Sequence, residues 1–469
     1  MKTWLIRIAS SVVLVFVSIV VGGAVSAVTR LPDLQPWHHL VSGLEPRAAE
    51  MTAGFTLDEY LRREEAVFRE ARDVVEAGAS AGANPAVPNR YVTSSRSHPL
   101  KFGDWNRTQV LDTPDPKGGV LLVHGLTDSP YSMRAVAASF HDRGFYTLSL
   151  RMQGHGTVPG GLVNTDWEDW MAAVTMGARH VWQRIGPDRP LVLVGYSNGG
   201  ALVTKFALDA IENPSLPSPS RLILISPMIG VSPTAWLARA ISRLGPVVEK
   251  ARWLDVLPEY NPFKYNSFPA NAGYQSARLT GALGEQLGRL AEAGRLQKLA
   301  PVLAFQSVVD STVSAPAVIY DLFDRLPVGG HELVLFDLNR QARLDAFLKP
   351  GAVLPRLLGE GTHRFSVTLV TNTSPETLAA AEMTVAAEAA TMTGEPIGLA
   401  WPADMYSLSH VALPFPESDP LYGRQGPLGS VTPRGEKGVL IVSLDSLMRV
   451  SWNPFFPYLA SRIERATAF

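Results

Sequence analysis

The sequence predicts an α/β fold with a mostly parallel central sheet and helices on both of its faces. Helical stretches at 132–143 and 167–185 lie among short apolar runs, a pattern typical of a parallel sheet that is covered on both sides. The composition is 46% hydrophobic and 18% charged, which suits a globular protein with a sizeable core. The runs expected to be strands are 119–123, 145–150, 191–194, 222–225, 302–305 and 333–336.

The overall charge and the cysteine count exclude several classes of function. The net charge is −1 and no lysine- or arginine-rich run is present, so nucleic acid is not an expected partner. The chain has no cysteine, which excludes disulfides, thiolate metal sites and a cysteine nucleophile. The histidines are scattered without the spacing of a metal site, so we expect no metal ion and no cofactor.

The N-terminus predicts a membrane segment. Lys2 and Arg7 precede an uncharged, mainly apolar stretch at 8–28. About 20 apolar residues span a bilayer as a helix, and flanking cations stay on the cytoplasmic side. We therefore expect residues 1–28 to anchor the chain with the rest of it outside the cytoplasm, in the periplasm or beyond the cell. Cleavage after the small residues 25–27 would instead make the protein secreted.

The region after this segment is expected to connect it to the globular body. Residues 29–90 predict a linker with one amphipathic helix, which a capping box at Thr56–Glu59 opens and which runs to about Ala77. The α/β core is then expected to comprise 91–230 and 301–469.

Two stretches interrupt the alternation of strands and helices. Residues 231–300 contain no strand-like run but several helical stretches and clustered aromatic residues, so we expect a helical cap. Residues 341–400 are expected to form a second insertion within the core. This insertion has one strand-like run, 365–370, and an alanine-rich segment, 375–392, that predicts a helix.

The motif Gly-x-Ser-x-Gly occurs twice, and its surroundings distinguish the two copies. The copy around Ser80 lies in a small-residue linker with no strand before it, so we interpret it as a chance match. The copy around Ser197 follows the predicted strand 191–194 and precedes an amphipathic stretch at 201–211. A strand–turn–helix context holds a serine hydroxyl at the carboxyl edge of a sheet, so Ser197 is the candidate nucleophile.

An upstream motif makes the likeness to a known family specific. A strand that ends in His124-Gly125-Leu126, followed by Gly-x-Ser-x-Gly, resembles the α/β-hydrolase family. The resemblance implies that the backbone N–H groups of Leu126 and Asn198 form the oxyanion hole. We expect His124 to support this turn rather than to transfer protons.

Further motifs are similar to one branch of that family. Arg151-Met152-Gln153-Gly154-His155-Gly156-Thr157 and Asn164-Thr165-Asp166-Trp167-Glu168-Asp169-Trp170 resemble the monoacylglycerol lipase and serine aminopeptidase-like branch. In that branch a mobile lid follows the strand after the nucleophile helix, which is where 231–300 lies.

The base of the serine must be one of the three histidines that follow Ser197 in the chain. Catalytic groups of a parallel sheet lie beyond the carboxyl ends of its strands. His331 and His363 both precede predicted strands, so they lie at the wrong edge. His410 remains as the predicted base, although about seventy residues separate it from the last predicted strand, more than is usual for the family this chain resembles.

The predicted acid is Asp310, just beyond the carboxyl end of the strand 302–305. By the resemblance, this is where the family places the residue that orients the histidine. Asp337, after the next strand, is the rival.

These residues predict a serine hydrolase that cleaves carboxylic esters, including lipid-like ones, through an acyl-enzyme intermediate. A serine peptidase or amidase of the aminopeptidase type is the alternative within enzymes. A hydrolase fold that serves only as a binding protein is the alternative outside them.

Overall fold

The computed structural model describes residues 30–79, 88–230, 248–342, 361–430 and 443–469. The predicted anchor at 1–28 lies outside these residues, as does Ser80. Within the described ranges, no helix combines the length and the apolar character needed to cross a bilayer.

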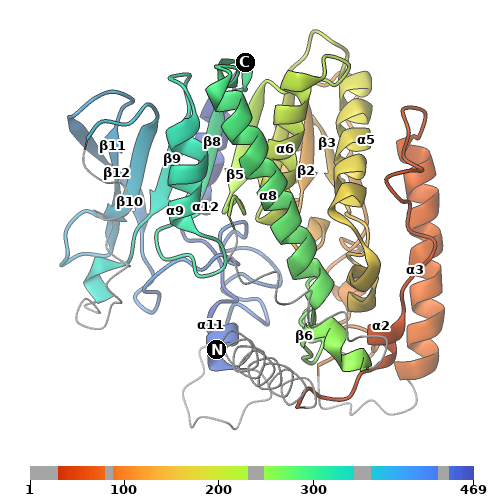
Figure 1. Cartoon of the computed structure of the whole chain (residues 1–469). Coiled ribbons are helices and arrows are strands. Elements are labelled where there is room, and N and C mark those ends of the chain that lie inside the picture. Colours follow the sequence, from red (N-terminus) through yellow and green to blue (C-terminus); the bar gives the residue numbers. More distant parts are fainter. Residues whose placement is uncertain (1–29, 80–87, 231–247, 343–360, 431–442) are drawn as a thin grey trace, which may run out of the picture.

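A ten-stranded sheet forms the centre of the molecule (Figure 1). Its order is β1-β3-β2-β4-β5-β8-β9-β10-β11-β12, and neighbouring strands run parallel from β3 to β10. β1 and β11 are antiparallel to the strands beside them. The strands are β1 (Gln109–Leu111), β2 (Gly119–Val123), β3 (Tyr146–Leu150), β4 (Leu191–Tyr196), β5 (Arg221–Ile225), β8 (Val302–Ser307), β9 (Glu332–Phe336), β10 (Ser366–Asn372), β11 (Ala379–Val385) and β12 (Met392–Ala400).

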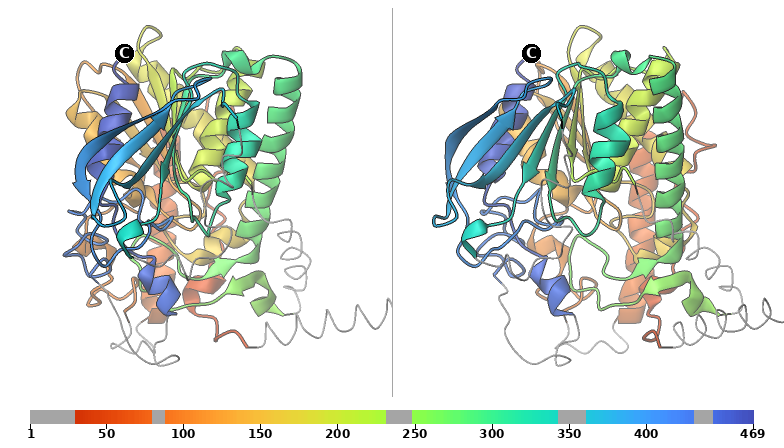
Figure 2. Two further views of the ribbon diagram at one scale, coloured as in Figure 1. Left: turned by 90° about the vertical axis from the view of Figure 1, so that its left-hand side faces the viewer. Right: turned by 60° about the vertical axis from the view of Figure 1, so that its left-hand side comes forward.

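Helices cover both faces of this sheet, and Figure 2 shows the sheet between them. One face carries α5 (Trp167–Ile185), α6 (Asn198–Glu212) and α8 (Ala270–Glu292), whose apolar residues share one core with the strands. The opposite face carries α4 (Arg134–Asp142) and α12 (Phe456–Ala466) over a second core. The predicted fold class and the six predicted strands, which are β2, β3, β4, β5, β8 and β9, are confirmed.

The described part of the expected cap is divided between a helix of the main layers and a loop. α8 packs beside α6 over the sheet, where its leucines are buried. The loop before it holds a short antiparallel pair, β6 (Trp253–Asp255) and β7 (Phe268–Pro269). Our prediction that this stretch contains no strand is therefore wrong.

The alanine-rich helix predicted at 375–392 is wrong as well. β11 occupies much of this range and pairs antiparallel with β10 on one side and β12 on the other. Alanine favours a helix only weakly, whereas an unpaired β10 would leave a long row of backbone groups without partners. The described part of 341–400 thus continues the central sheet, and the Thr368 and Thr384 hydroxyls lie 2.9 Å apart across β10 and β11.

The segment before the core includes the predicted helix, α3 (Leu57–Ala79), which lies outside α5 (Figure 1). Glu59 donates its backbone N–H to the Thr56 hydroxyl at 3.3 Å, as the capping box requires. Arg151, just after β3, is fully buried and bonded to Glu45 at 2.9 Å and to Glu64 at 3.0 Å. These buried ion pairs tie the segment to the end of a core strand.

The remaining short helices are α2 (Pro36–His39), α9 (Ala315–Ala317) and α11 (Leu444–Met448).

Candidate active site

Ser197 lies in a strained turn between β4 and α6. Its backbone has φ 54° and ψ −119°, a region that residues other than glycine rarely adopt. The turn is held because Ser197 donates its N–H to the Ile225 carbonyl at 3.0 Å and accepts from the Met228 N–H at 2.9 Å. Strain that the surrounding structure maintains in this way is typical of functional sites.

The glycines of the Gly-x-Ser-x-Gly motif are required by close backbone contacts. A Cβ atom at Gly199 would lie 2.1 Å from the Val123 carbonyl oxygen of β2. A Cβ atom at Gly195 would lie 2.4 Å from the Gly199 carbonyl oxygen. Both distances are far below van der Waals contact, so only glycine lets the turn, the helix and β2 approach this closely.

Asp310 follows β8 at the carboxyl edge of the sheet. Its carboxylate accepts hydrogen bonds from side-chain and backbone N–H groups. Its Oδ2 accepts from His410 Nδ1 at 2.8 Å and from Gln306 Nε2 at 3.0 Å. Its Oδ1 accepts from the backbone N–H groups of Thr312 at 2.8 Å and Val313 at 3.1 Å. Burial by itself raises the pKa of Asp310, but His410 and these N–H donors outweigh it and hold the pKa below its ordinary value.

The ionised Asp310 determines the tautomer of His410. A carboxylate can only accept hydrogen bonds, so His410 Nδ1 carries a proton and the neutral ring keeps its lone pair on Nε2. His410 is 3% exposed, and its carbonyl accepts from the Tyr196 hydroxyl at 3.2 Å. Tyr196 immediately precedes Ser197, so the histidine loop and the nucleophile turn are in contact.

The long stretch between β9 and His410 forms β10, β11 and β12, which extend the sheet. After these strands the chain returns to the end of β9. Asn339, just after β9, donates its backbone N–H to the Tyr406 carbonyl at 2.9 Å and its side-chain amide to the Met405 carbonyl at 2.9 Å. The loop that contains His410 is thus held by the loop that follows β9.

A residue near the C-terminus joins the histidine loop to the acid loop. The Ser409 hydroxyl donates to the Arg449 carbonyl at 2.6 Å, and the Arg449 guanidinium donates to the Thr312 hydroxyl. Sequence reasoning missed Arg449 and Gln306. Gln306 could have been found as a polar residue at the end of a buried strand, whereas Arg449 carries no sequence signal.

The other two histidines lie at the opposite edge of the sheet, as predicted. His331 precedes β9 and accepts from the Val302 N–H at 3.1 Å, and burial lowers its pKa to about 4. His363 precedes β10 and lies 4.0 Å from Asp324. Asp337, the rival acid, is bonded to Arg340 at 2.7 Å rather than to a histidine.

The predicted oxyanion residues flank the nucleophile. Asn198 is the first residue of α6, and a Cβ atom at Gly125 would lie 3.1 Å from Ser197 Cβ, which brings the Leu126 turn beside the serine. His124 braces this turn because its Nδ1 donates to the Gly125 carbonyl at 2.8 Å and its Nε2 accepts from the Met152 N–H at 3.1 Å. Burial lowers the pKa of His124 to about 4, so it stays neutral.

Comparison with known proteins agrees with this geometry. The family model described as "Serine aminopeptidase, S33" matches residues 114–337, a little under half of the chain. The chain has the α/β-hydrolase fold. The matched segment includes Ser197 and Asp310, whereas His410 lies beyond it.

Two curated relatives and one solved structure are similar to part of this chain. It is 27% identical over 196 residues to a thermostable monoacylglycerol lipase of Bacillus sp. (strain H-257), covering 42% of this chain and 71% of that protein. It is 36% identical over 75 residues to a carboxylesterase of Bacillus subtilis (strain 168), covering 15% and 30%. A structure of Paleococcus ferrophilus monoacylglycerol lipase has 20% identity and a TM-score of 0.37, covering 49% and 87%.

The described cap loop of this hydrolase packs against the oxyanion turn. Tyr265 donates its N–H to the Thr127 carbonyl at 2.7 Å, and Phe263 stacks on Tyr131 with ring centroids 3.9 Å apart. Asp128, next to Thr127, is buried, which raises its pKa to about 6 against the attraction of Lys264. The cap therefore contributes a cation to the neighbourhood of the site.

Proposed function

We propose that this α/β-hydrolase is a serine hydrolase that cleaves carboxylic esters. The observation that carries the proposal is the buried hydrogen bond between His410 Nδ1 and Asp310 Oδ2, on the histidine loop that contacts the strained turn of Ser197. A serine hydroxyl is a weak nucleophile and needs a base whose orientation and tautomer are maintained by a third group.

In the proposed mechanism, His410 Nε2 takes the Ser197 proton as the serine oxygen attacks the acyl carbonyl. The tetrahedral oxyanion is stabilised by the N–H groups of Leu126 and Asn198, the second of which lies at the positive end of α6. His410 then donates its proton to the leaving alcohol, and water releases the acyl group by the reverse sequence. Asp310 stays ionised throughout and stabilises the imidazolium.

The ester preference is supported by the relatives named as a monoacylglycerol lipase and a carboxylesterase. We propose a lipid-like ester as the substrate class. A peptidase or amidase activity is the second candidate, supported by the description of the matching family model.

We also propose that residues 8–28 anchor the hydrolase to a membrane with its site outside the cytoplasm. Lys2 and Arg7 before an uncharged apolar stretch support this orientation. Fractionation of cells that express the full chain tests it: we expect the protein in the membrane pellet and accessible to protease from outside. Soluble protein of full mass would contradict an anchor, and soluble protein that has lost its N-terminus would indicate secretion.

The first test of catalysis is covalent labelling with a fluorophosphonate probe and mapping of the modified residue by mass spectrometry. We expect labelling at Ser197 in the wild-type full chain and none in Ser197→Ala, with normal folding. Ser80→Ala is the matched control and should label fully. A folded wild-type sample that does not label would favour the binding-protein alternative.

Turnover of p-nitrophenyl acyl esters against aminoacyl p-nitroanilides then separates esterase from peptidase.

A further inference from the structure

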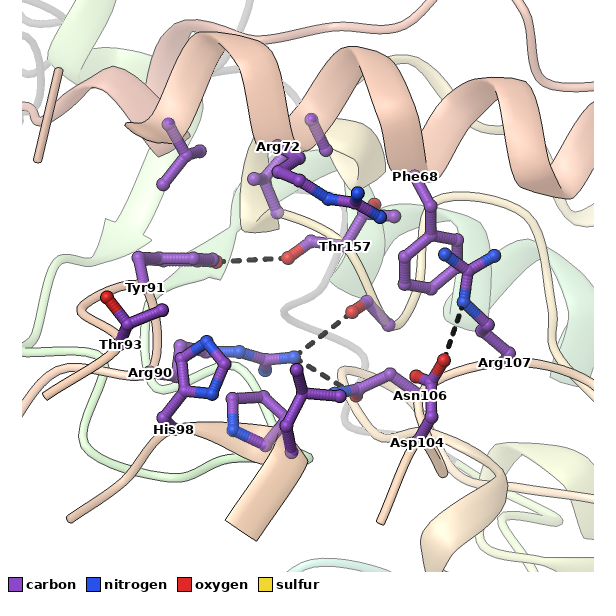
Figure 3. A pocket seen from close by; sticks show the side chains of 16 residues that line it. Phe68, Arg72, Arg90, Tyr91, Thr93, His98, Asp104, Asn106, Arg107 and Thr157 are labelled. Carbon is purple, nitrogen blue, oxygen red and sulfur yellow. Dashed lines mark hydrogen bonds and ion pairs between the residues drawn. The ribbon is translucent and has the colours of Figure 1, made fainter. Parts of the chain in front are cut away.

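A cavity separate from the candidate active site lies between α3 and two loops of the core (Figure 3). Its volume is about 390 Å³, within the range of small-molecule sites. The loops are 90–107 and 156–158, and Ser197, Asp310 and His410 are not among its lining residues.

Arg90 is the buried cation among the residues that line this cavity. Its side chain is 3% exposed, and its Nη2 donates to Asn106 Oδ1 at 3.0 Å and to the Gly156 carbonyl at 3.1 Å. Its Nη1 is buried and has no hydrogen-bond partner among the described residues. A buried guanidinium with an unused donor is costly to maintain unless an acceptor reaches it.

A buried acid near Arg90, Glu259, is engaged by other donors. Glu259 is buried and accepts from the backbone N–H groups of Asn266 at 3.0 Å and Ser267 at 2.8 Å. Burial raises the pKa of Glu259, against these donors and the attraction of Arg90.

The other charged residues of the lining are two arginines and one acid. Arg72 and Arg107 line the cavity with Arg90, whereas Asp104 is the only acid among the lining residues. Arg107 is already balanced, because it pairs with Asp104 at 2.9 Å and with Glu65 at 2.7 Å. The cations of the lining that an entering anion would meet are therefore Arg72 and Arg90.

The remaining wall is largely apolar. α3 contributes Phe68, Ala71 and Val75, and the loops contribute Tyr91 and Val158. Ala71 and Val75 are buried, whereas Leu100, at the rim, is 68% exposed. The cavity thus combines one deep cationic donor with an apolar side wall and an opening to solvent.

We propose that this cavity binds a small amphiphile with a single anionic head group. The head, a carboxylate or a phosphate monoester, accepts from Arg90 Nη1, and the apolar tail lies along Phe68, Ala71 and Val75. The site is also close to the oxyanion turn: the Arg90 guanidinium lies 5.3 Å from the ring of Tyr265, whose N–H is bonded to Thr127. The proposal concerns binding and does not depend on the proposed catalytic function.

Isothermal titration calorimetry of the full chain in nonionic detergent tests the proposal with octanoate, octyl phosphate and octanol. We expect the two anions to bind and octanol to bind at least about tenfold more weakly, which corresponds to about 1.4 kcal/mol. Octanoate binding with no octyl phosphate binding identifies a carboxylate head, and the reverse a phosphate head. Equal affinity for octanol would overturn the anionic recognition, and acetate binding as tightly as octanoate would overturn the apolar part.

Variants assign the binding to this cavity rather than to the catalytic site. Arg90→Gln and Ala71→Phe should each weaken octanoate or octyl phosphate binding by at least about tenfold. Ala71→Phe fills the tail wall without touching Arg90, so it decides the question if Arg90→Gln does not fold. Arg143→Gln is the matched control, because Arg143 also has a buried Nη without a partner among the described residues but does not line the cavity. Unchanged affinity in folded Arg90→Gln and Ala71→Phe would refute the proposal.

Discussion

At the scale of single residues, the base assignment depends on which histidine the fold brings to the nucleophile. His410 is bonded to Asp310 at the carboxyl edge of the sheet, whereas His363 lies at the amino edge near Asp324. We expect His410→Ala to lower kcat/KM by at least about a thousandfold, because that is what members of a serine triad contribute. His363→Ala should keep near wild-type turnover in the same ester assay. A loss of kcat/KM in His363→Ala but not in His410→Ala would identify His363 as the base.

Asp128 predicts how stability depends on pH. Burial raises its pKa from 3.8 to about 6, so the folded state binds this proton more tightly than the unfolded state does. The free energy of unfolding should therefore fall as the pH rises from about 4 to about 6, by on the order of 3 kcal/mol.

Urea unfolding of wild type and Asp128→Asn at several pH values measures this effect. Because the asparagine does not titrate, the difference in unfolding free energy between the two proteins should shift in favour of Asp128→Asn through this window and stay constant above it. A pH-independent difference would show that Asp128 has an ordinary pKa in the folded state.

At the scale of elements, the nucleophile turn tolerates no side chain at its glycines. We expect Gly199→Ala to lower the free energy of unfolding by about 3 kcal/mol, because its Cβ would meet the Val123 carbonyl oxygen at 2.1 Å. Gly281→Ala in α8 is the control, since nothing lies within 4 Å of that Cβ. The control should gain about 1 kcal/mol from helix propensity. Urea unfolding measures both variants. An unchanged free energy of unfolding in Gly199→Ala would mean that the turn can relax.

The predicted and observed elements differ where pairing partners outweigh local preference. The strands β2, β4, β5, β8 and β9 are mainly apolar runs, and they are buried as the sequence pattern predicts. β11 is rich in alanine and would suit a helix, but it lies between β10 and β12, which supply partners for its backbone on both sides. A single segment carries no information about such neighbours.

At the scale of the whole molecule, buried ion pairs attach the N-terminal segment to the core. Glu64 accepts from Arg151 Nε at 3.0 Å and from the Thr108 hydroxyl at 2.8 Å, and both Glu64 and Arg151 are buried. We expect Glu64→Ala to lower the free energy of unfolding by about 3 kcal/mol at pH 8, because it leaves the buried Arg151 cation short of a partner. The same variant should increase proteolysis within α3.

Glu65→Ala is the matched control for this prediction. Glu65 is the next residue along α3, is half exposed and pairs with Arg107 at 2.7 Å. An exposed pair of this kind contributes less than about 1 kcal/mol. Equal losses of unfolding free energy in the two variants would mean that Arg151 finds another partner when Glu64 is removed.

The sequence by itself determined the α/β-hydrolase fold, because buried parallel strands and the tight turn around Ser197 impose local patterns that a single chain displays. It also predicted Asp310, by the family resemblance and its place after a strand, and His410, because the other two later histidines precede strands. The structure places Asp310 and His410 in hydrogen-bonding contact. Only the tertiary structure decided that β10, β11 and β12 extend the sheet and that Glu45 and Glu64 meet Arg151. The cavity at Arg90 also appears only in the tertiary structure. These features depend on contacts between residues far apart in the chain, which no local pattern encodes.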